Sequence, residues 1–165
     1  MDPAPAAGEE LPAAAMEALT ELYARVDALL AEHQPICKRS GLCCDFPRSD
    51  HELWSSALET AYARQAVGGE VPPAPSGLCP WHVEGSCRNR EGRPLGCRLY
   101  FCDPAWAGPM PDAYERFHAE LKALHEEHGV GYRYERFVDA VVRDAPGGPA
   151  AEAPDGGPSH QEESP

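Results

Sequence analysis

Seven cysteines are the residues of this sequence with the clearest capacity for chemistry, and they lie between positions 37 and 102. Three of them fall in the stretch "ICKRSGLCCDF" at residues 36–46, and two of these are adjacent. Thiolate sulfur binds zinc and iron–sulfur clusters, and pairs of thiols form disulfides or take part in redox exchange. The candidate ligands are Cys37, Cys43, Cys44, Cys79, Cys87, Cys97 and Cys102.

Energetics and compartment favour metal binding over disulfides. Two thiolates about 4 Å apart repel each other by about 4 kcal/mol at an effective dielectric constant near 20, whereas a bound cation reverses the sign of that term. A structural zinc site contributes about 10–16 kcal/mol of apparent binding free energy, and a disulfide about 2–5 kcal/mol. The N-terminal stretch has no basic region and no apolar run of a secretory signal, so we expect a cytoplasmic protein whose thiols stay reduced.

The adjacent pair Cys43 and Cys44 suggests more than one metal atom. Neighbouring side chains of an extended segment point to opposite sides, so such a pair serves two metal atoms, or two irons of one cluster, more easily than one tetrahedral ion. Seven thiols also exceed the four that one closed zinc site or one ordinary cluster requires. The sequence therefore favours two sites or one polynuclear site.

Charge narrows the choice of partners. The 27 Asp and Glu residues against 14 Lys and Arg give a net charge of −13, which repels phosphate backbones and anionic lipid headgroups. We therefore expect no nucleic-acid partner and no membrane partner, and no apolar run of 18 residues is present. Four arginines are interleaved with the later cysteines: Arg88, Arg90, Arg93 and Arg98. They are either ordinary surface residues or groups that neutralise thiolate charge.

The elements expected to position the cysteines are mainly helical. Apolar residues at alternating spacings of four and three predict a helix from about residue 12 to 33, and Pro35 ends it. The pair Ser49 and Glu52 predicts a capping box for a second helix that continues to about residue 67. A third helix is expected from about residue 112 to 128, and a short last one from 137 to 142.

All seven cysteines are expected in loops or turns outside these helices, and "WHVEGSCRN" predicts a short β-hairpin turning at Glu84, Gly85 and Ser86. The predicted fold is mainly α, a small single domain of about four helices with two irregular cysteine-rich loops and this hairpin. Its domain spans residues 12–143, between a disordered tail at 1–11 and a disordered, acidic, Pro/Gly-rich tail at 144–165.

The stretch "CKRSGLCC" resembles the paired-cysteine signature of the YkgJ-type cysteine-cluster family, whose members are described as a zinc- or iron-chelating domain. The later block "CPWHVEGSCRNREGRPLGCRLYFC" is similar to that family's second half, and the resemblance covers roughly residues 36–137. It implies that the seven cysteines bind zinc or iron, the iron in an iron–sulfur cluster. Where the family has its second cysteine, this chain has Ser40, so a site could be completed by His82, Asp45 or a water.

Three functions stay open at this point. The first is a metal-binding protein of zinc or an iron–sulfur cluster. The second is an iron–sulfur oxidoreductase or a component of a modifying enzyme, since a missing cysteine leaves a coordination position open. The third is a metal-free thiol redox sensor. No phosphate-binding glycine motif, nucleophile elbow or zinc-protease helix motif is present, so enzyme activity is not claimed.

Overall fold

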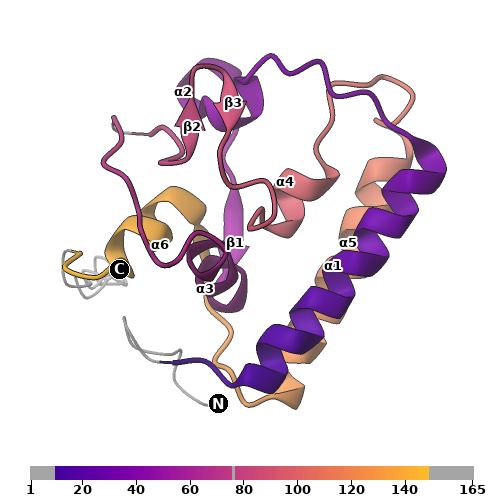
Figure 1. Cartoon of the computed structure of the whole chain (residues 1–165). Helices are drawn as coiled ribbons and strands as arrows, with labels where there is room; N and C mark the ends of the chain where they lie inside the picture. The colour runs from indigo at the N-terminus through magenta and orange to yellow at the C-terminus, as the bar shows by residue number, and fades with distance from the viewer. Residues whose placement is uncertain (1–9, 76, 149–165) are drawn as a thin grey trace, which may run out of the picture.

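Two long antiparallel helices form one side of the molecule (Figure 1). The structure, a computed structural model, describes residues 10–75 and 77–148. Helix α1 (Ala13–His33) buries one stripe of apolar residues, and helix α5 (Pro109–Glu127) packs against that stripe through residues that include Phe117 and Leu121. The 12–33 prediction is confirmed to within one residue, because the apolar spacing matches the buried face. Most of the predicted tails at 1–11 and 144–165 lies outside the described residues.

The end of α1 directs the chain toward the first cysteine segment. Gln34 takes a left-handed conformation with φ of 49°, and its N–H donates to the carbonyl of Leu30 at 2.7 Å. Pro35 follows, and a proline cannot continue the helix because it lacks the backbone N–H. The extended chain then crosses to the β-hairpin region (Figure 1), and this segment contains Cys37.

The second predicted helix is wrong in its start and its cap. Residues Trp54–Ser56 form strand β1, and helix α3 spans Ala57–Gln65. The capping box is made by Ser56 and Glu59, seven residues after the predicted pair. Strand β1 pairs antiparallel with β4 (Tyr134–Arg136), with Ser55 opposite Glu135, and this pairing of distant segments was not predicted.

Each of these two strands runs directly into a helix. Strand β1 leads into α3, and β4 leads into α6 (Phe137–Arg143). The two helices therefore lie side by side, and a partly buried network of ion pairs joins the end of α6 to β4 through Arg143, Glu135 and Asp144. Asp144 is itself buried, although it is the first residue of the predicted acidic tail.

Short elements form the remaining part of the fold. The 3-10 turn η1 spans Leu42–Cys44, helix α2 Phe46–Ser49 and helix α4 Leu95–Leu99. The predicted hairpin is confirmed as β2 (His82–Val83) and β3 (Ser86–Cys87), with Glu84 and Gly85 at positive φ between them, as a tight hairpin turn requires. The mainly α character is confirmed, although α2 and α4 bring the helices of the described chain to six.

Two apolar clusters stabilise the fold. The first joins α1, α3, α4 and α5 and contains no cysteine. The second lies under the cysteine segments and includes Phe46, Trp81 and Phe137 together with Cys44 and Cys79. The pair of long helices and the cysteine region therefore have separate cores, and α3 contributes to both, through Leu58 to the first and Ala63 to the second. None of the helices in the described part of the chain is long and apolar enough to cross a membrane.

Candidate metal centre

All seven cysteines face two adjoining cavities, although they come from segments up to 65 residues apart in sequence. An interior cavity of about 50 Å³ is lined by Cys37, Cys43, Cys44, Cys79, Cys87 and Cys97. A mouth cavity of about 230 Å³, which shares four of these residues, adds Cys102. The fold therefore brings the predicted site residues into one region.

Cys44 is the central member of the set. It is only 6% exposed, and its thiol interacts with those of Cys43, Cys79 and Cys87. The Sγ atoms of Cys43 and Cys44 lie 4.0 Å apart. The expectation that this adjacent pair points to opposite sides is wrong, because the chain here forms a 3-10 turn rather than an extended segment. Both thiols of the pair face the same cavities.

Backbone contacts hold this turn against the hairpin. The N–H of Cys44 donates to the carbonyl of Gly41 at 3.1 Å, and the N–H of Cys79 donates to the carbonyl of Cys44 at 3.3 Å. Gly41 has φ of 73°, and a Cβ there would lie 2.8 Å from the Cα of Gly85 in the hairpin turn. Only glycine allows both the left-handed conformation and so close an approach of two backbones.

Cys97 is an exception to the prediction that every cysteine lies in a loop or turn. It lies within helix α4, which follows Pro94 and buries Leu95 and Leu99 in the helical core. The short helix therefore anchors one thiol of the cysteine region directly to the other half of the fold. Cys87 is likewise in strand β3, paired with His82.

Hydrogen bonding among the thiols alters their acidities. The pKa values of Cys43 and Cys87 are lowered to about 6, first of all by the hydrogen bond of each with Cys44, and that of Cys79 is lowered for the same reason. The same contacts raise the pKa of Cys44, and burial raises that of Cys97. Without a metal, the cluster therefore favours thiolates at Cys43, Cys79 and Cys87 and protonated thiols at Cys44 and Cys97. A metal that took Cys44 or Cys97 as a ligand would have to displace its proton.

Two of the four arginines considered from the sequence stand at these cavities. Arg93 and Arg90 line the interior cavity, and their charges help to lower the pKa of Cys87. Arg98 has a different role: it is 4% exposed, its guanidinium lies 4.0 Å from the ring centre of Tyr23, and it pairs with Asp27 at 3.2 Å. Arg88 is exposed and lines neither cavity.

The residues considered as completing ligands lie at different places. Ser40 lines the mouth cavity, and its Oγ accepts a hydrogen bond from the N–H of Leu42 at 3.4 Å. His82 lines neither cavity and packs behind Gly41, where its Nε2 is buried without a partner among the described residues. Asp45 pairs with Arg48 at 3.5 Å and is absent from both cavity walls. Of the three, Ser40 alone faces the cysteines.

Two further residues shape the interior cavity without a signal in the cysteine spacing. The indole Nε1 of Trp81 is buried and has no hydrogen-bond partner among the described residues, and Trp81 lines the interior cavity. Asn89 holds the loop after β3 in place, because its Nδ2 donates to the carbonyl of Ala63 at 2.7 Å and its Oδ1 accepts from the N–H of Gly92 at 3.1 Å. The cysteine spacing pointed to neither Trp81 nor Asn89.

The donor set suits a thiophilic metal, but it is not arranged in coordination geometry. Within residues 10–75 and 77–148, no group of three or more His, Cys, Asp or Glu side chains is positioned so that it could hold a metal ion as it stands. The chemistry of the cavity nevertheless fits zinc or iron and sulfur: soft thiolates, nearby guanidinium groups, and an unpartnered indole N–H that can donate to sulfur.

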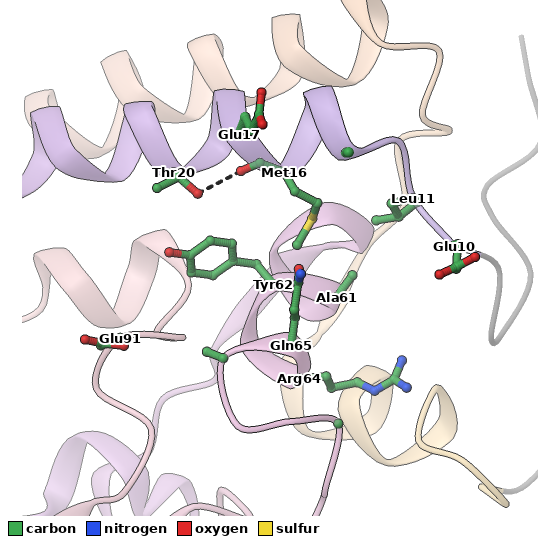
Figure 2. Close-up of a pocket in the computed structure, with 13 residues that line it drawn as sticks. Glu10, Leu11, Met16, Glu17, Thr20, Ala61, Tyr62, Arg64, Gln65 and Glu91 are labelled. Atoms are coloured by element: carbon green, nitrogen blue, oxygen red, sulfur yellow. Dashed lines mark hydrogen bonds between the residues drawn. The ribbon is translucent and has the colours of Figure 1, made fainter.

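Another cavity, of about 780 Å³, lies between α1 and α3, away from the cysteines (Figure 2). Met16 and Tyr62 approach each other across it, and acidic residues such as Glu17 and Glu91 stand at its border (Figure 2). It contains no cysteine or histidine. The wall of this cavity therefore offers no thiol or imidazole ligand. Comparison of the chain with protein-family models, with curated proteins and with solved structures found no match.

Proposed function

We propose that this chain is a metal-binding protein whose clustered cysteines bind zinc or an iron–sulfur cluster. The observation that supports this most directly is the convergence of all seven cysteines on two adjoining cavities. The proposed ligands are drawn from Cys37, Cys43, Cys44, Cys79, Cys87, Cys97 and Cys102. The resemblance to the YkgJ-type cysteine-cluster family supports the same proposal.

Free thiols in this arrangement need a cation. All seven cysteines are free of disulfides, and three of them have lowered pKa values. Thiolates gathered in a small apolar space repel each other strongly, and a bound metal ion converts that repulsion into attraction. Because the core around Phe46, Trp81 and Phe137 is small, the metal would also supply much of the free energy that orders the cysteine segments.

The residues around the thiols have separate parts in this proposal. Arg93 would balance the negative charge that remains on a thiolate-ligated metal, and the unpartnered indole N–H of Trp81 would be available to donate to a sulfur ligand. When bound, zinc would cross-link the segments, and an iron–sulfur cluster would in addition accept or donate an electron. Gly41 allows the first cysteine loop to approach the hairpin turn at Gly85, and Asn89 ties the loop after β3 to α3.

A second candidate is an iron–sulfur oxidoreductase or a component of a modifying enzyme. The mouth cavity favours it, because Cys37 is exposed there and Cys102 is partly exposed, so a small molecule can reach the thiols from solvent. A third candidate, the metal-free thiol redox sensor, is favoured by the pKa of about 6 at Cys43 and Cys87, since accessible thiolates oxidise readily.

Anaerobic purification followed by elemental analysis, an ultraviolet–visible spectrum and thiol titration tests the three candidates together. We expect roughly one or more atoms of zinc or iron per chain and few titratable thiols in the native protein. A colourless zinc protein supports the structural role, and a brown protein with visible absorption supports the iron–sulfur candidate. Protein without metal and with most thiols reactive would refute the proposal in favour of the redox sensor.

Substitution of Ser40 by cysteine is expected to strengthen metal retention. Ser40 is exposed at the mouth cavity, so a thiol there adds a soft donor beside Cys37 and Cys102. We expect release of metal to a chelator to slow by about tenfold, on the scale of one improved ligand. The matched control is Ser86→Cys, which adds a thiol to the same cavity from the hairpin. Equal release rates for wild type and Ser40→Cys would contradict the expectation.

A further inference from the structure

We infer that the mouth cavity is a binding site for a small oxyanion, a carboxylate or phosphate group, next to the cysteines. The protein as a whole is strongly acidic, with a net charge of −13, yet the wall of this cavity contains Lys38, Arg39 and Arg90 and no Asp or Glu. A concentration of positive charge at one cavity of an acidic protein attracts anions to that cavity.

These three cations are not engaged elsewhere by carboxylates. Six arginines of the chain form ion pairs, but Lys38, Arg39 and Arg90 form none with the carboxylates of the described residues. Lys38 does act electrostatically on one carboxylate, that of Asp103, because its charge helps to lower the pKa of that group. The two carboxylate oxygens of Asp103 already accept hydrogen bonds from the backbone N–H groups of Ile36 and Ala105, each at 3.0 Å. This carboxylate is therefore engaged by the backbone rather than by Lys38.

The cavity also offers neutral donors on a fixed frame. Ser40 and Ser86 line it from opposite loops, and hydroxyl groups donate readily to oxyanions. The two loops touch at Gly41 and Gly85, where a Cβ on Gly41 would lie 2.8 Å from the neighbouring Cα. Because the loops are in backbone contact, the donors on either side are held at a set spacing, which reduces the entropy cost of binding.

Size and wall chemistry limit the ligand. A volume of about 230 Å³ is below the range of about 300–1,000 Å³ that is typical of drug-sized ligands. Tyr100 and Phe101 form an apolar part of the wall, so a ligand with one anionic group and a short apolar portion fits best. Its anionic group would lie between the cations and the thiols.

The inference rests on the proposed function in one respect. Arg90 lines both cavities, so thiolates that are not bound to a metal compete with an incoming anion for its guanidinium group. A metal bound by these thiolates reduces their negative charge, so Arg90 at the mouth is available to a ligand while Arg93 stays beside the metal. The site itself, however, consists of Lys38, Arg39, Arg90 and two serines, so it can be measured whatever the metal content.

Calorimetric titration of the full chain with inorganic phosphate, and separately with acetate, tests the inference. We expect at least one probe to bind, with an affinity that falls as ionic strength rises. The double variant Arg39→Gln with Arg90→Gln should bind that probe roughly tenfold more weakly. The matched control, Arg116→Gln with Lys122→Gln on α5, removes the same charge away from the cavity and should keep the affinity within about twofold.

The outcomes separate the two proposals. The metal content of each preparation is measured by elemental analysis, and absence of metal counts against the proposed function. Anion binding is measured separately by the calorimetric titration, so it is tested whether or not metal is present. Absence of binding by both probes overturns the inference, and so does equal weakening in the two double variants. If phosphate binds and acetate does not, the site is one for phosphate groups, and the reverse result assigns it to carboxylates.

Discussion

Replacement of Cys44 by serine should release the metal proposed for this site and unfold the cysteine region while the two long helices remain. Cys44 is the thiol that interacts with three others, and it is 6% exposed, so no other donor can take its place. Substitutions of groups that only orient metal ligands cost about 10–100-fold in affinity, so we expect loss of this ligand to cost at least about 100-fold.

The separate cores predict what survives this substitution. Helices α1 and α5 pack in the cluster that contains no cysteine, whereas Cys44 belongs to the cluster around Phe46 and Trp81. Far-ultraviolet circular dichroism should therefore show most of the helical signal retained, while thiol titration in the native state should rise toward all the remaining cysteines. Elemental analysis of the same sample measures the loss of metal.

Cys37→Ser provides the matched control for Cys44→Ser. Both residues line both cavities, but Cys37 is exposed and lies in the extended segment before the 3-10 turn. We expect a smaller loss of metal in this variant, because a more exposed donor is more easily replaced by water. Wild-type metal content in Cys44→Ser would contradict the prediction that Cys44 is an essential metal ligand. A larger loss of metal in Cys37→Ser than in Cys44→Ser would show that the exposed thiol is the more important ligand.

The sequence predicted the helices whose apolar spacing is long and regular. Leu19, Leu22 and Val26 follow the predicted spacing of α1, and all three are buried against α5 or its neighbours. The same method failed for the segment before α3. Two candidate capping boxes, starting at Ser49 and at Ser56, stand seven residues apart, and local sequence cannot rank them. The choice depends on Glu59 meeting α1 and α4, which is a tertiary effect.

The set of cysteines was also predictable, but its geometry was not. Residue type and spacing pointed to all seven thiols, which do converge on one region. The expectation of opposite directions for Cys43 and Cys44 assumed an extended chain, whereas Gly41 at positive φ starts a turn that brings the two sulfur atoms to 4.0 Å. Pairing of β1 with β4 was not foreseeable either, because each strand has three residues and the partners are about 80 residues apart.

Removal of the Glu59 carboxylate should strongly destabilise the helical half of the molecule. Glu59 is 1% exposed and lies where α1, α3 and α4 meet. Its Oε2 accepts the N–H of Ser56 at 2.7 Å, and its Oε1 accepts the N–H of Leu95 at 2.8 Å and the hydroxyl of Tyr23 at 3.2 Å. In Glu59→Ala these buried donors lose their acceptor, and each unsatisfied group costs about 1–3 kcal/mol.

We therefore expect Glu59→Ala to lower the free energy of unfolding by about 3–5 kcal/mol, since a void and a lost helix cap add to the unsatisfied donors. The matched control is Glu59→Gln, which keeps the side-chain volume and one carbonyl oxygen and should cost about 1–2 kcal/mol. Urea unfolding followed by circular dichroism measures both. Equal midpoints for wild type and Glu59→Ala would show that the three hydrogen bonds contribute nothing net to stability.

The pH dependence of the same pair of proteins isolates the ionisation of Glu59. Burial raises the pKa of its carboxyl, so the folded protein binds this proton more tightly than the unfolded chain does. The resulting stabilisation is complete below the unfolded pKa of about 4.3 and is lost as pH rises through the higher folded value. The free energy of unfolding of the wild type, relative to that of Glu59→Gln, should therefore fall as pH rises above about 4.3. Loss of metal at low pH affects both proteins and cancels in the difference. A difference that instead grows with rising pH would mean that the three donors hold the carboxylate ionised against the effect of burial.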